Sequence, residues 1–419
     1  MKILIYGINY APELTGIGKY SGEMAEWLAR RGNEVRVVTA PPYYPQWRVS
    51  EGYSTWRYRR ERLRGVDVRR CPLWVPRRPS GMTRILHLAS FALFSFPVML
   101  AQLLWRPDVV VVVEPPLFCA PAAVVVAGLA GSRAWLHVQD FEVDAAFDLG
   151  ILRSRGMQGV VRAVERWLLK RFDRTSTISG RMLAGLEGKG VADERRVFFP
   201  NWVDTRVIQP VAAQNPFRRE LRIGPREIVA LYSGNMGQKQ GLEMLIGSAR
   251  MLVYRGLVRF VLCGQGAAYE GLRRETREMP NVLWLPLQPE ERLNELLNLA
   301  DIHLLPQRED AADLVMPSKL TGIMASGRPV VATAREGTEV WSVVRGRGVT
   351  VPPGDPGAFA AAIVELANDP VRRERLGAEA RRYAVDHLDK EKVLAAFEME
   401  LSRLAASREA VAYGLRQRA

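Results

Sequence analysis

The chain has 419 residues, 48% of them hydrophobic, and a formal net charge of +14. This length can bury a large core and favours two domains over one. Its three cysteines and four histidines are too scattered for a disulfide framework or a zinc site, which excludes the small disulfide-rich and zinc-finger classes and favours a reducing cytoplasm.

The first half of the chain alternates apolar strands with helical stretches, as a doubly wound sheet does. Strands are predicted at 2–6, 34–39, 66–71, 109–113, 134–138, 174–178 and 197–199. A helix is predicted at 18–31 and should end at Gly32. The N-terminus runs from a strand into a glycine turn and lacks the cleavage site of a secretory signal.

A glycine-containing loop, YAPELTGIGKY at 10–20, follows the first predicted strand and opens the helix. Gly16 and Gly18 let the backbone approach a ligand, and a helix N-terminus favours an anion. A nicotinamide fingerprint would need a third glycine at position 21, where this chain has Ser21. The loop therefore favours an anionic ligand other than a nicotinamide dinucleotide.

Positive charge is concentrated in the first half, where residues 1–200 hold 29 Lys and Arg against 18 Asp and Glu, a difference of +11. Ten arginines lie between 57 and 84: Arg57, Arg59, Arg60, Arg62, Arg64, Arg69, Arg70, Arg77, Arg78 and Arg84. Trp56, Tyr58 and Trp74 lie among them. No helix-turn-helix, zinc finger or aromatic RNA-binding motif accompanies the charge, so we expect no nucleic-acid partner.

A nearly uncharged run at 85–105 follows these arginines directly. Its length would suffice to cross a bilayer, but His87, Pro97 and Gln102 lie inside it and a sheet strand is predicted immediately after it. We favour an internal helix with one face toward lipid, beside a basic arm that attracts an anionic membrane surface through Arg57, Arg59, Arg60, Arg62 and Arg64. An ordinary buried helix beside a solvated arginine loop is the alternative.

Alternating carboxylates leave the strand predicted at 134–138, in the segment HVQDFEVD at 137–144. Asp140, Glu142 and Asp144 offer the oxygen ligands that divalent cations prefer. A metal site at this strand end is one interpretation of the pattern, and a candidate catalytic carboxylate at Asp140 is another.

The second half repeats the alternation after a proline-containing segment at 205–226 that reads as a linker. Strands are predicted at 228–234, 258–264, 282–285, 302–306, 330–333 and 348–351, and helices at 241–255 and 290–300. From about residue 369 the chain is expected to be helical to its end. Two Rossmann-like halves place ligands at the carboxyl ends of their strands.

Glycine-rich loops follow the first two predicted strands of this half. SGNMGQKQGLE at 233–243 offers Gly234, Asn235, Lys239 and Gln240, and the next strand ends at Gly264. Lys239 is a candidate to balance part of a phosphate charge, with a solvated lysine in an ordinary turn as the alternative.

The most informative segment is MPSKLTGIMASGRPVVAT at 316–333, which reads as loop, short helix, turn and buried strand. Ser318 and Lys319 offer a hydroxyl and an ammonium beside the unpaired N–H groups of the first helical turn. Gly327 can end the helix in a left-handed conformation. The polar loop after the strand carries Glu336 and Glu339. A plain helix ending in a glycine turn is the alternative for this segment taken alone.

These segments together resemble the retaining glycosyltransferases of the two-domain GT-B type, family 4. The stretch 324–332 is similar to that family's EAMA-x-G-x-P-V-V-A helix and strand, 337–339 to its GG-x-x-E loop, and PNWVD at 200–204 to its P-N-G-V-D signature. The resemblance implies domains at 1–204 and 227–385 facing a central cleft, a linker at 205–226, and a helical tail at 386–419 that returns to the N-terminal domain.

The resemblance also implies roles for the residues above. Lys239 and Lys319 would stabilise the leaving diphosphate, and Asp140 would be a catalytic carboxylate. Donor-binding residues would be Gly16, Gly18, Gly234, Asn235, Gln240, Gly264, Ser318, Glu336 and Glu339. No metal or other cofactor is expected, because lysines and backbone N–H groups serve the phosphates.

Three departures from the family pattern stand out. Two glutamates that the family often carries, at the donor sugar and the ribose, fall at Leu314 and Gly322 here. Asp310 and Asp313 are the nearest acidic substitutes. Gln139 replaces a histidine that relatives often place near the reacting face of the sugar, which leaves the catalytic base open.

We therefore predict transfer of a sugar, with retention, from a nucleotide diphosphate sugar to a hydroxyl of a polyprenyl-diphosphate-linked glycan. The resemblance is strongest to enzymes of the colanic-acid type, which assemble exopolysaccharide repeat units. The expected location is cytoplasmic, at the inner face of the membrane. The alternative is a non-catalytic membrane- or nucleic-acid-binding protein that retains the GT-B shell.

Overall fold

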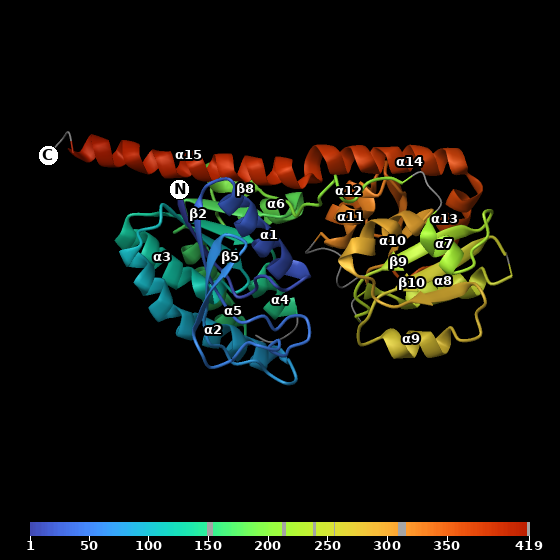
Figure 1. The fold of residues 1–419 in the computed structure, drawn as a ribbon, viewed down its shortest axis with the longest axis horizontal. Helices are drawn as coiled ribbons and strands as arrows, with labels where there is room; N and C mark the ends of the chain where they lie inside the picture. The colour runs from blue at the N-terminus through green and yellow to red at the C-terminus, as the bar shows by residue number, and fades with distance from the viewer. Residues whose placement is uncertain (149–153, 212–214, 238–239, 255, 309–315, 417–419) are drawn as a thin grey trace. The chain divides into compact units, whose positions relative to one another are not determined.

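The computed structural model describes residues 1–148, 154–211, 215–237, 240–254, 256–308 and 316–416. The chain forms two compact units (Figure 1): Met1–Pro200 with Leu394–Ala419, and Asn201–Val393. Each unit contains its own sheet, flanked by helices. The predicted class, two Rossmann-like α/β domains, is confirmed.

The sheet of the first unit has the strand order β3-β4-β2-β1-β5-β6-β7-β8 and is parallel except for the β3–β4 pair. The strands are β1 Lys2–Tyr6, β2 Glu34–Thr39, β3 Arg59–Leu63, β4 Val66–Arg70, β5 Val109–Glu114, β6 Arg133–Val138, β7 Arg174–Thr177 and β8 Arg196–Phe198. Each predicted strand of this half is found, with ends that differ by at most one residue. Strand β3 was not predicted.

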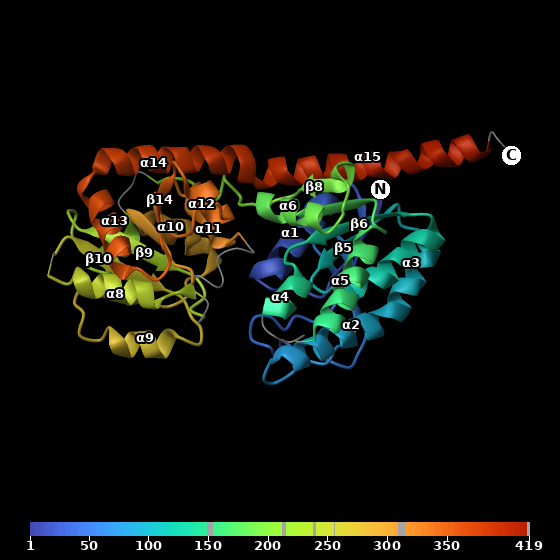
Figure 2. The ribbon, with the colours of Figure 1, turned by 180° about the vertical axis from the view of Figure 1, so that it is seen from behind.

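Helices of the first unit lie on both faces of its sheet (Figures 1 and 2). They are α1 Gly16–Arg30, α2 Gly81–Ala101, α3 Ala120–Ala130, α4 Glu142–Asp148, α5 Arg155–Leu169, α6 Gly180–Gly188 and the end of α15 Lys390–Arg416, with short turns η1 Gln102–Leu104, η2 Leu117–Cys119 and η3 Asp193–Arg195. The connection from β1 to β2 through α1 runs toward β3, whereas α2, α3 and α5 connect strands in the opposite direction. Because such crossovers are right-handed, α2, α3 and α5 share the face opposite α1.

The last helix packs on the first unit. The ring of Phe397 stacks on Phe199 and meets Trp135 edge-on, at centroid distances of 4.1 and 5.1 Å. Its neighbour Glu398 accepts hydrogen bonds from Arg31 and Asn33 at 3.1 and 2.7 Å. The return of the tail to the N-terminal half, which the family resemblance implied, is thus explained by one buried aromatic cluster and a polar pair at its edge.

The predicted basic arm is partly a strand of the sheet rather than a loop. Strand β3 pairs antiparallel with β4, and Arg60 forms a bidentate ion pair with Asp67 on that neighbour at 3.0 Å. Arg64 pairs with Glu26 at 2.9 Å, and Arg59 lies 3.4 Å from a Glu61 carboxylate oxygen. The Arg60–Asp67 pair crosses the hairpin, the Arg59–Glu61 pair lies within β3, and the Arg64–Glu26 pair joins the turn to α1, so these pairs hold the charged edge in an ordered strand.

Three further arginines of the predicted arm differ in their surroundings. Arg70 is buried, and its guanidinium donates to Glu61, to the Ala40 carbonyl and to the Ala11 carbonyl. Arg70 therefore stabilises the interior of the first unit and cannot contact a membrane. Arg57 and Arg62 are exposed, and neither forms an ion pair within the part of the chain that the structure describes.

The apolar run at 85–105 forms α2 and η1, a little earlier than predicted. His87, Phe91, Ser95 and Met99 are buried on its packed side, and the Tyr6 hydroxyl lies 2.6 Å from Ser95 Oγ. By length and composition the helix could cross a membrane. In its most apolar stretch of 18 residues, 28% is buried inside the protein. On the other side Met82, Leu86, Leu93 and Phe96 are exposed. One packed and one exposed side agree with the internal helix that we favoured, while contact with lipid stays a prediction.

The second unit has a six-stranded, all-parallel sheet with the order β11-β10-β9-β12-β13-β14. The strands are β9 Ile228–Ser233, β10 Val258–Cys263, β11 Val282–Leu285, β12 Ile302–Leu305, β13 Val330–Thr333 and β14 Gly348–Val351. The helices are α7 Pro216–Glu220, α8 Glu243–Met251, α9 Tyr269–Glu275, α10 Leu293–Leu299 after η5 Glu290–Arg292, α11 Lys319–Ala325, α12 Glu339–Val344, α13 Pro356–Asn368, α14 Pro370–Tyr383 and the π-turn Ala384–Leu388. All six predicted strands are found.

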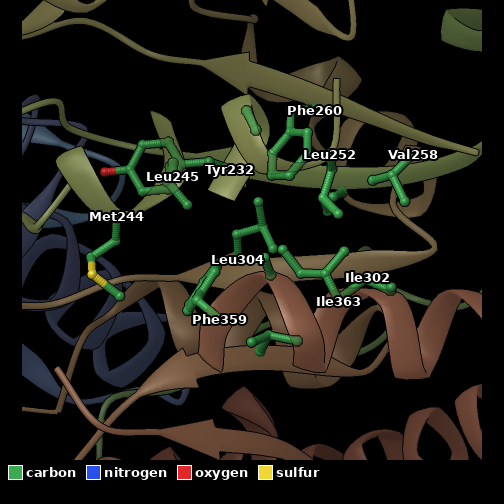
Figure 3. Packing of buried hydrophobic residues seen from close by; sticks show 14 of the residues in the cluster. Tyr232, Met244, Leu245, Leu252, Val258, Phe260, Ile302, Leu304, Phe359 and Ile363 are labelled. Carbon is green, nitrogen blue, oxygen red and sulfur yellow. The ribbon is translucent and has the colours of Figure 1, made fainter. Parts of the chain in front are cut away.

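Apolar side chains fill both sides of this sheet. On one side Phe260 and Leu304 from the strands meet Ile363 and Phe359 from α13 (Figure 3). On the other side Phe217 of α7 is fully buried against Val229 and Leu231. The described part of the predicted linker 205–226 is therefore packed into the second unit, because Phe217 supplies an apolar anchor that its prolines concealed.

Candidate functional site

The strand order of the second unit contains a switch point. The chain proceeds from β9 to β10 and β11 on one side, and from β12 to β13 and β14 on the other. Loops that follow β9 and β12 therefore diverge and leave a crevice at the carboxyl ends of these adjacent strands, where open α/β sheets bind ligands. The described part of the predicted glycine loop at 233–243 and residues 306–308 after β12 lie there.

Glycines allow the loops after β9 and β10 to approach each other closely. Gly264 has φ +154°, and a Cβ there would lie 1.9 Å from the Gly234 carbonyl oxygen. Gly266 has φ +153°, and a Cβ there would lie 2.5 Å from the Met236 carbonyl oxygen. The Gly234 N–H donates to Cys263 O at 3.0 Å. Because Gly264 and Gly266 have no side chains, the backbones of the two loops pack directly against each other and form the floor of the crevice.

Lys319, at the start of α11, projects over this floor. Its Nζ donates to the Tyr232 hydroxyl and to Gln240 Oε1, both at 3.1 Å, and lies 4.4 Å from the Tyr232 ring centroid. A Cβ on Gly234 would lie 3.1 Å from the same Nζ. The ammonium is therefore held against the end of β9 by a hydroxyl, an amide oxygen and an aromatic face.

Electrostatics make this ammonium receptive to an anion. Burial lowers the pKa of Lys319 to about 8, and its two hydrogen-bond acceptors are neutral groups. The Tyr232 hydroxyl in turn donates to the Asn235 carbonyl at 2.6 Å, and burial raises its pKa, so it stays protonated. A desolvated cation with no carboxylate partner among the described residues is well suited to bind a phosphate oxygen.

Gln307, the second residue after β12, lies at the same strand end. Its backbone N–H donates to Thr333 Oγ1 at 2.6 Å, which ties it to β13, while its buried Oε1 has no hydrogen-bond partner among the described residues. A Cβ on Gly241, which has φ +62°, would lie 3.0 Å from the Gln307 carbonyl carbon. A pocket of about 700 Å³ extends from here, lined by Gly241, Glu243, Met244, Gln307, Arg308, Gly354 and Pro356.

The structure brings several predicted residues together around Lys319 and leaves others apart. Gly234 and Gln240 lie beside Lys319, Asn235 accepts a hydrogen bond from Tyr232, and Gly264 packs against Gly234. Ser318 is exposed and its hydroxyl makes no capping bond, so its predicted role in donor binding stays a prediction. Lys239, Asp310, Asp313 and Leu314 lie outside the described residues.

The polar loop after β13 follows the same sheet edge. Thr338 caps α12 by accepting the Trp341 N–H at 3.3 Å, Glu336 is exposed, and Glu339 occupies the first turn of that helix. Gly322, where relatives often carry a glutamate, lies inside α11, and a Cβ there would approach Leu297 Cδ1 to 3.3 Å. A longer side chain at 322 would therefore have to displace Leu297.

The first unit has a corresponding loop after β1, centred on a residue that we did not predict. Glu13 is buried, and one carboxylate oxygen accepts the N–H groups of Tyr43 and Tyr44 at 3.1 and 3.0 Å while the other accepts the Asn9 amide at 2.9 Å. Burial raises the pKa of Glu13, and the three donated hydrogen bonds oppose that rise. A Cβ on Gly18 would lie 2.4 Å from Glu13 Oε2, so the predicted glycine at 18 makes room for this carboxylate.

The carboxylates after β6 do not converge on one point. Asp140 is half-buried, Glu142 accepts the Leu117 N–H at 2.7 Å, and Asp144 pairs with Lys189 at 2.8 Å. No group of three metal-ligating side chains gathers anywhere in the described part of the chain. Burial, together with the Asp140 charge, raises the pKa of Glu142 to about 7.

His137 and Gln139 form a buried polar chain beside Asp140. The Gln139 amide nitrogen lies 2.9 Å from His137 Nε2, and His137 Nδ1 lies 2.9 Å from Ser176 Oγ. Burial lowers the pKa of His137 to about 3, so the imidazole is neutral at physiological pH. The glutamine that replaces the family's usual histidine is thus a hydrogen-bond donor to a neutral ring.

Two family models match the chain, one in each unit. Residues 15–202 match the family described as "Glycosyl transferase 4-like domain", and residues 227–369 match "Glycosyl transferases group 1". A "Putative colanic acid biosynthesis glycosyl transferase WcaI" of Escherichia coli K12 is 46% identical over 408 residues, or 95% of this chain and 98% of that protein. A "Probable glycosyltransferase WbjE" of Pseudomonas aeruginosa is 26% identical over 282 residues, or 66% of this chain and 70% of that protein.

Solved structures show the same fold at low sequence identity. Sucrose-phosphate synthase from Thermosynechococcus elongatus superposes with a TM-score of 0.75 at 18% identity, covering 97% of this chain and 100% of that one. WaaG, a glycosyltransferase involved in lipopolysaccharide biosynthesis, gives 0.67 at 15% identity over 96% of this chain and 99% of that one. Fold and site thus define a two-domain glycosyltransferase of the GT-B type.

The chain belongs to the glycosyltransferase family whose members combine a 4-like N-terminal domain with a group 1 C-terminal domain. The family predicted from the 316–339 segment and the glycine loops is confirmed, and the protein is an enzyme of this class.

Proposed function

We propose that this enzyme transfers a sugar, with retention, from a nucleotide diphosphate sugar to a hydroxyl of a polyprenyl-diphosphate-linked glycan during cell-surface polysaccharide assembly. The observation that carries the proposal is Lys319, a desolvated ammonium whose hydrogen-bond acceptors among the described residues are both neutral groups, at the switch point of the second unit. A cation preorganised in this way stabilises the charge that develops on a departing diphosphate.

The chemistry requires little from the protein beyond that stabilisation. The bond from the sugar C1 to the β-phosphate oxygen breaks, a bond from C1 to the acceptor oxygen forms on the same face, and the acceptor proton passes to the departing diphosphate. Asp140 remains the candidate catalytic carboxylate of the first unit. Lys319, the unpartnered Gln307 amide oxygen and the backbone of Gly234 would hold the donor.

The substrate classes rest on the relatives. The Escherichia coli relative is named for colanic acid biosynthesis, and 46% identity over nearly its full length supports a related exopolysaccharide reaction here. One structural neighbour, Anabaena HepE, was solved with UDP, at a TM-score of 0.71 and 15% identity. A polyprenyl-linked acceptor implies a cytoplasmic enzyme that attaches to the inner face of the membrane through α2 and the exposed arginines Arg57 and Arg62.

Two measurements test this proposal. A thermal-shift screen of UDP-, GDP- and ADP-sugars should reveal stabilisation by one nucleotide class, because a ligand that binds only the folded state raises the melting temperature. That donor, incubated with a polyprenyl-diphosphate-linked glycan, should yield a product whose new anomeric centre keeps the donor configuration by NMR. No stabilisation and no transfer with any donor would instead favour the non-catalytic alternative.

We further propose that the reaction needs no metal ion. Lys319 and the backbone N–H groups supply positive potential at the crevice, and the carboxylates after β6 are engaged with Leu117 N–H and Lys189. Turnover should therefore persist in excess EDTA. Activity that is abolished by EDTA and restored by manganese would reassign Asp140, Glu142 and Asp144 as metal ligands.

A further inference from the structure

Helix α5 of the first unit presents an apolar stripe to solvent, outside the membrane contact considered so far. Its inner side packs on the unit through Leu168 and Leu169, which are 5% and 2% exposed. The same side carries Glu165, which is buried and accepts two hydrogen bonds from Lys189 at 2.8 Å. The helix is therefore anchored by its own core contacts, so the apolar residues elsewhere on it are not needed for packing.

Those remaining apolar residues form a second stripe. Met157, Val160, Val164 and Trp167 follow one another at intervals of three, four and three residues, so they lie along one side of the helix. Their side chains are 48%, 64%, 50% and 54% exposed. Single exposed apolar residues are ordinary, whereas four in a row on one helix indicate a contact surface.

Basic residues occupy the rest of the exposed side of α5. Arg162, Arg166 and Lys170 recur every four residues and are all exposed. Arg171 lies at the end of the apolar stripe, with its guanidinium 4.7 Å from the Trp167 ring. An apolar stripe that contains a tryptophan, with a cation at its end and further cations on the remaining exposed side, is complementary to an anionic bilayer surface, where each basic residue close to the plane contributes about 1 kcal/mol.

We propose that α5 lies in the plane of an anionic membrane surface, with Met157, Val160, Val164 and Trp167 at the boundary between headgroups and acyl chains. The right-handed crossovers place α5 on the same face of the sheet as α2 and α3, which also expose Leu93 and Leu129 (Figure 2). The face would thus make two separate contacts with lipid. The membrane contact itself does not depend on the proposed function. Only the role that we give it, access to a lipid-linked acceptor, rests on that function.

A single-site fluorescent label tests it directly. The three native cysteines are at most 1% exposed, and burial raises the pKa of Cys71 to about 12 and of Cys263 to about 11, so a maleimide dye should react with an introduced thiol alone. On Val164→Cys, an NBD label should brighten several-fold and shift to the blue with vesicles of phosphatidylglycerol and phosphatidylcholine. The same label on Ser402→Cys, an exposed position of α15, should not respond.

A partition measurement provides the second readout. Val160→Gln/Val164→Gln should lower the vesicle partition coefficient by about tenfold, the equivalent of about 1.4 kcal/mol of lost apolar burial. The control Val371→Gln changes an exposed valine of the second unit and should leave partition unchanged. The double variant should keep its folded-state melting temperature, because neither valine is packed.

The outcomes separate this inference from the proposed function. A silent label at 164, with partition unchanged in the double variant, would overturn the role of α5, even if the enzyme still floats through α2 and the arginines. Brightening without vesicles, accompanied by a dimer in light scattering, would show that a second copy of the chain covers the stripe and would equally overturn it. Transfer to a water-soluble acceptor analogue should be unaffected by the double variant, and its absence in wild-type enzyme would count against the proposed function alone.

Discussion

The glycine loops after the first strand of each unit, β1 and β9, occupy equivalent positions in similar sheets but are built around opposite charges. After β1 the central group is the Glu13 carboxylate, which binds the N–H groups of Tyr43 and Tyr44. After β9 it is the Lys319 ammonium, which donates to a hydroxyl and an amide oxygen. In the first loop backbone donors are thus consumed by the protein's own anion, whereas in the second a cation remains to be neutralised.

This difference indicates which unit is suited to which substrate. An anionic diphosphate would be repelled by a buried carboxylate and attracted by a desolvated ammonium. We therefore expect the donor to bind the second unit, and an acceptor that presents hydroxyl groups to bind the first.

The largest effect is expected from Lys319→Ala. Removing one preorganised donor to the leaving group typically costs a hundredfold or more in kcat. Steady-state kinetics with the donor found by thermal shift would measure it, and Lys392→Ala, an exposed lysine of the same unit, should be neutral. Wild-type turnover in the alanine variant would remove Lys319 from the mechanism.

Gly264→Ala should destabilise the second unit by about 2 kcal/mol or more, because the added Cβ would collide with the Gly234 carbonyl at a strained φ of +154°. The matched control Gly271→Ala lies in helix α9 with open space around it, and should instead stabilise by about 0.5–1 kcal/mol. Urea unfolding of both variants measures the contrast. Equal stabilities would mean that the two loops are not in contact.

Donor affinity should depend on pH through Lys319. Its pKa lies near 8 in the folded enzyme against 10.5 for an ordinary lysine, so the donor KM should rise by about tenfold between pH 7 and pH 9 as the ammonium is lost. The unfolded chain keeps this proton up to pH 10.5, so the contribution of Lys319 to folding stability rises over the same window. Affinity and this stability contribution should therefore change in opposite directions. A flat KM profile, or the same rise in Lys319→Ala, would contradict this.

Glu13→Gln should have the smallest effect, about 1 kcal/mol in stability, because the amide keeps one oxygen for the Tyr43 and Tyr44 N–H groups but exchanges a charged acceptor for a neutral one. Its kinetic effect should fall on the acceptor KM and spare the donor KM. The exposed Glu51→Gln is the control. A selective loss of donor affinity would reverse the assignment of the two units.

Strand positions were predictable because most strands are short apolar runs bounded by turns. Strand β3 was missed since Arg59–Leu63 contains one apolar residue, and its stability comes from ion pairs such as Arg60–Asp67 that periodicity does not reveal. Helix boundaries were less accurate, and α8 is shorter than the predicted helix at 241–255.

The residues of the candidate site also differ in how far the sequence predicts them. Lys319 and the glycines were predictable from local motifs, whereas Tyr232 and Gln307 were not. Tyr232 resembles an ordinary strand residue, and its bond to Lys319 joins positions 87 residues apart. Glu13 was missed for a related reason, because its partners at 43 and 44 are brought to it only by the pairing of β1 with β2. Contacts set by strand order leave no local signal in the sequence.

The central claim, that the cation of the second unit holds the donor diphosphate, is tested most directly by calorimetric titration of the free nucleoside diphosphate. Lys319→Met removes the charge with little change in volume, and Glu13→Gln removes the opposite charge in the first unit. The account predicts at least tenfold weaker binding to Lys319→Met and unchanged binding to Glu13→Gln. Unchanged binding to Lys319→Met, or weakened binding to Glu13→Gln alone, would contradict it.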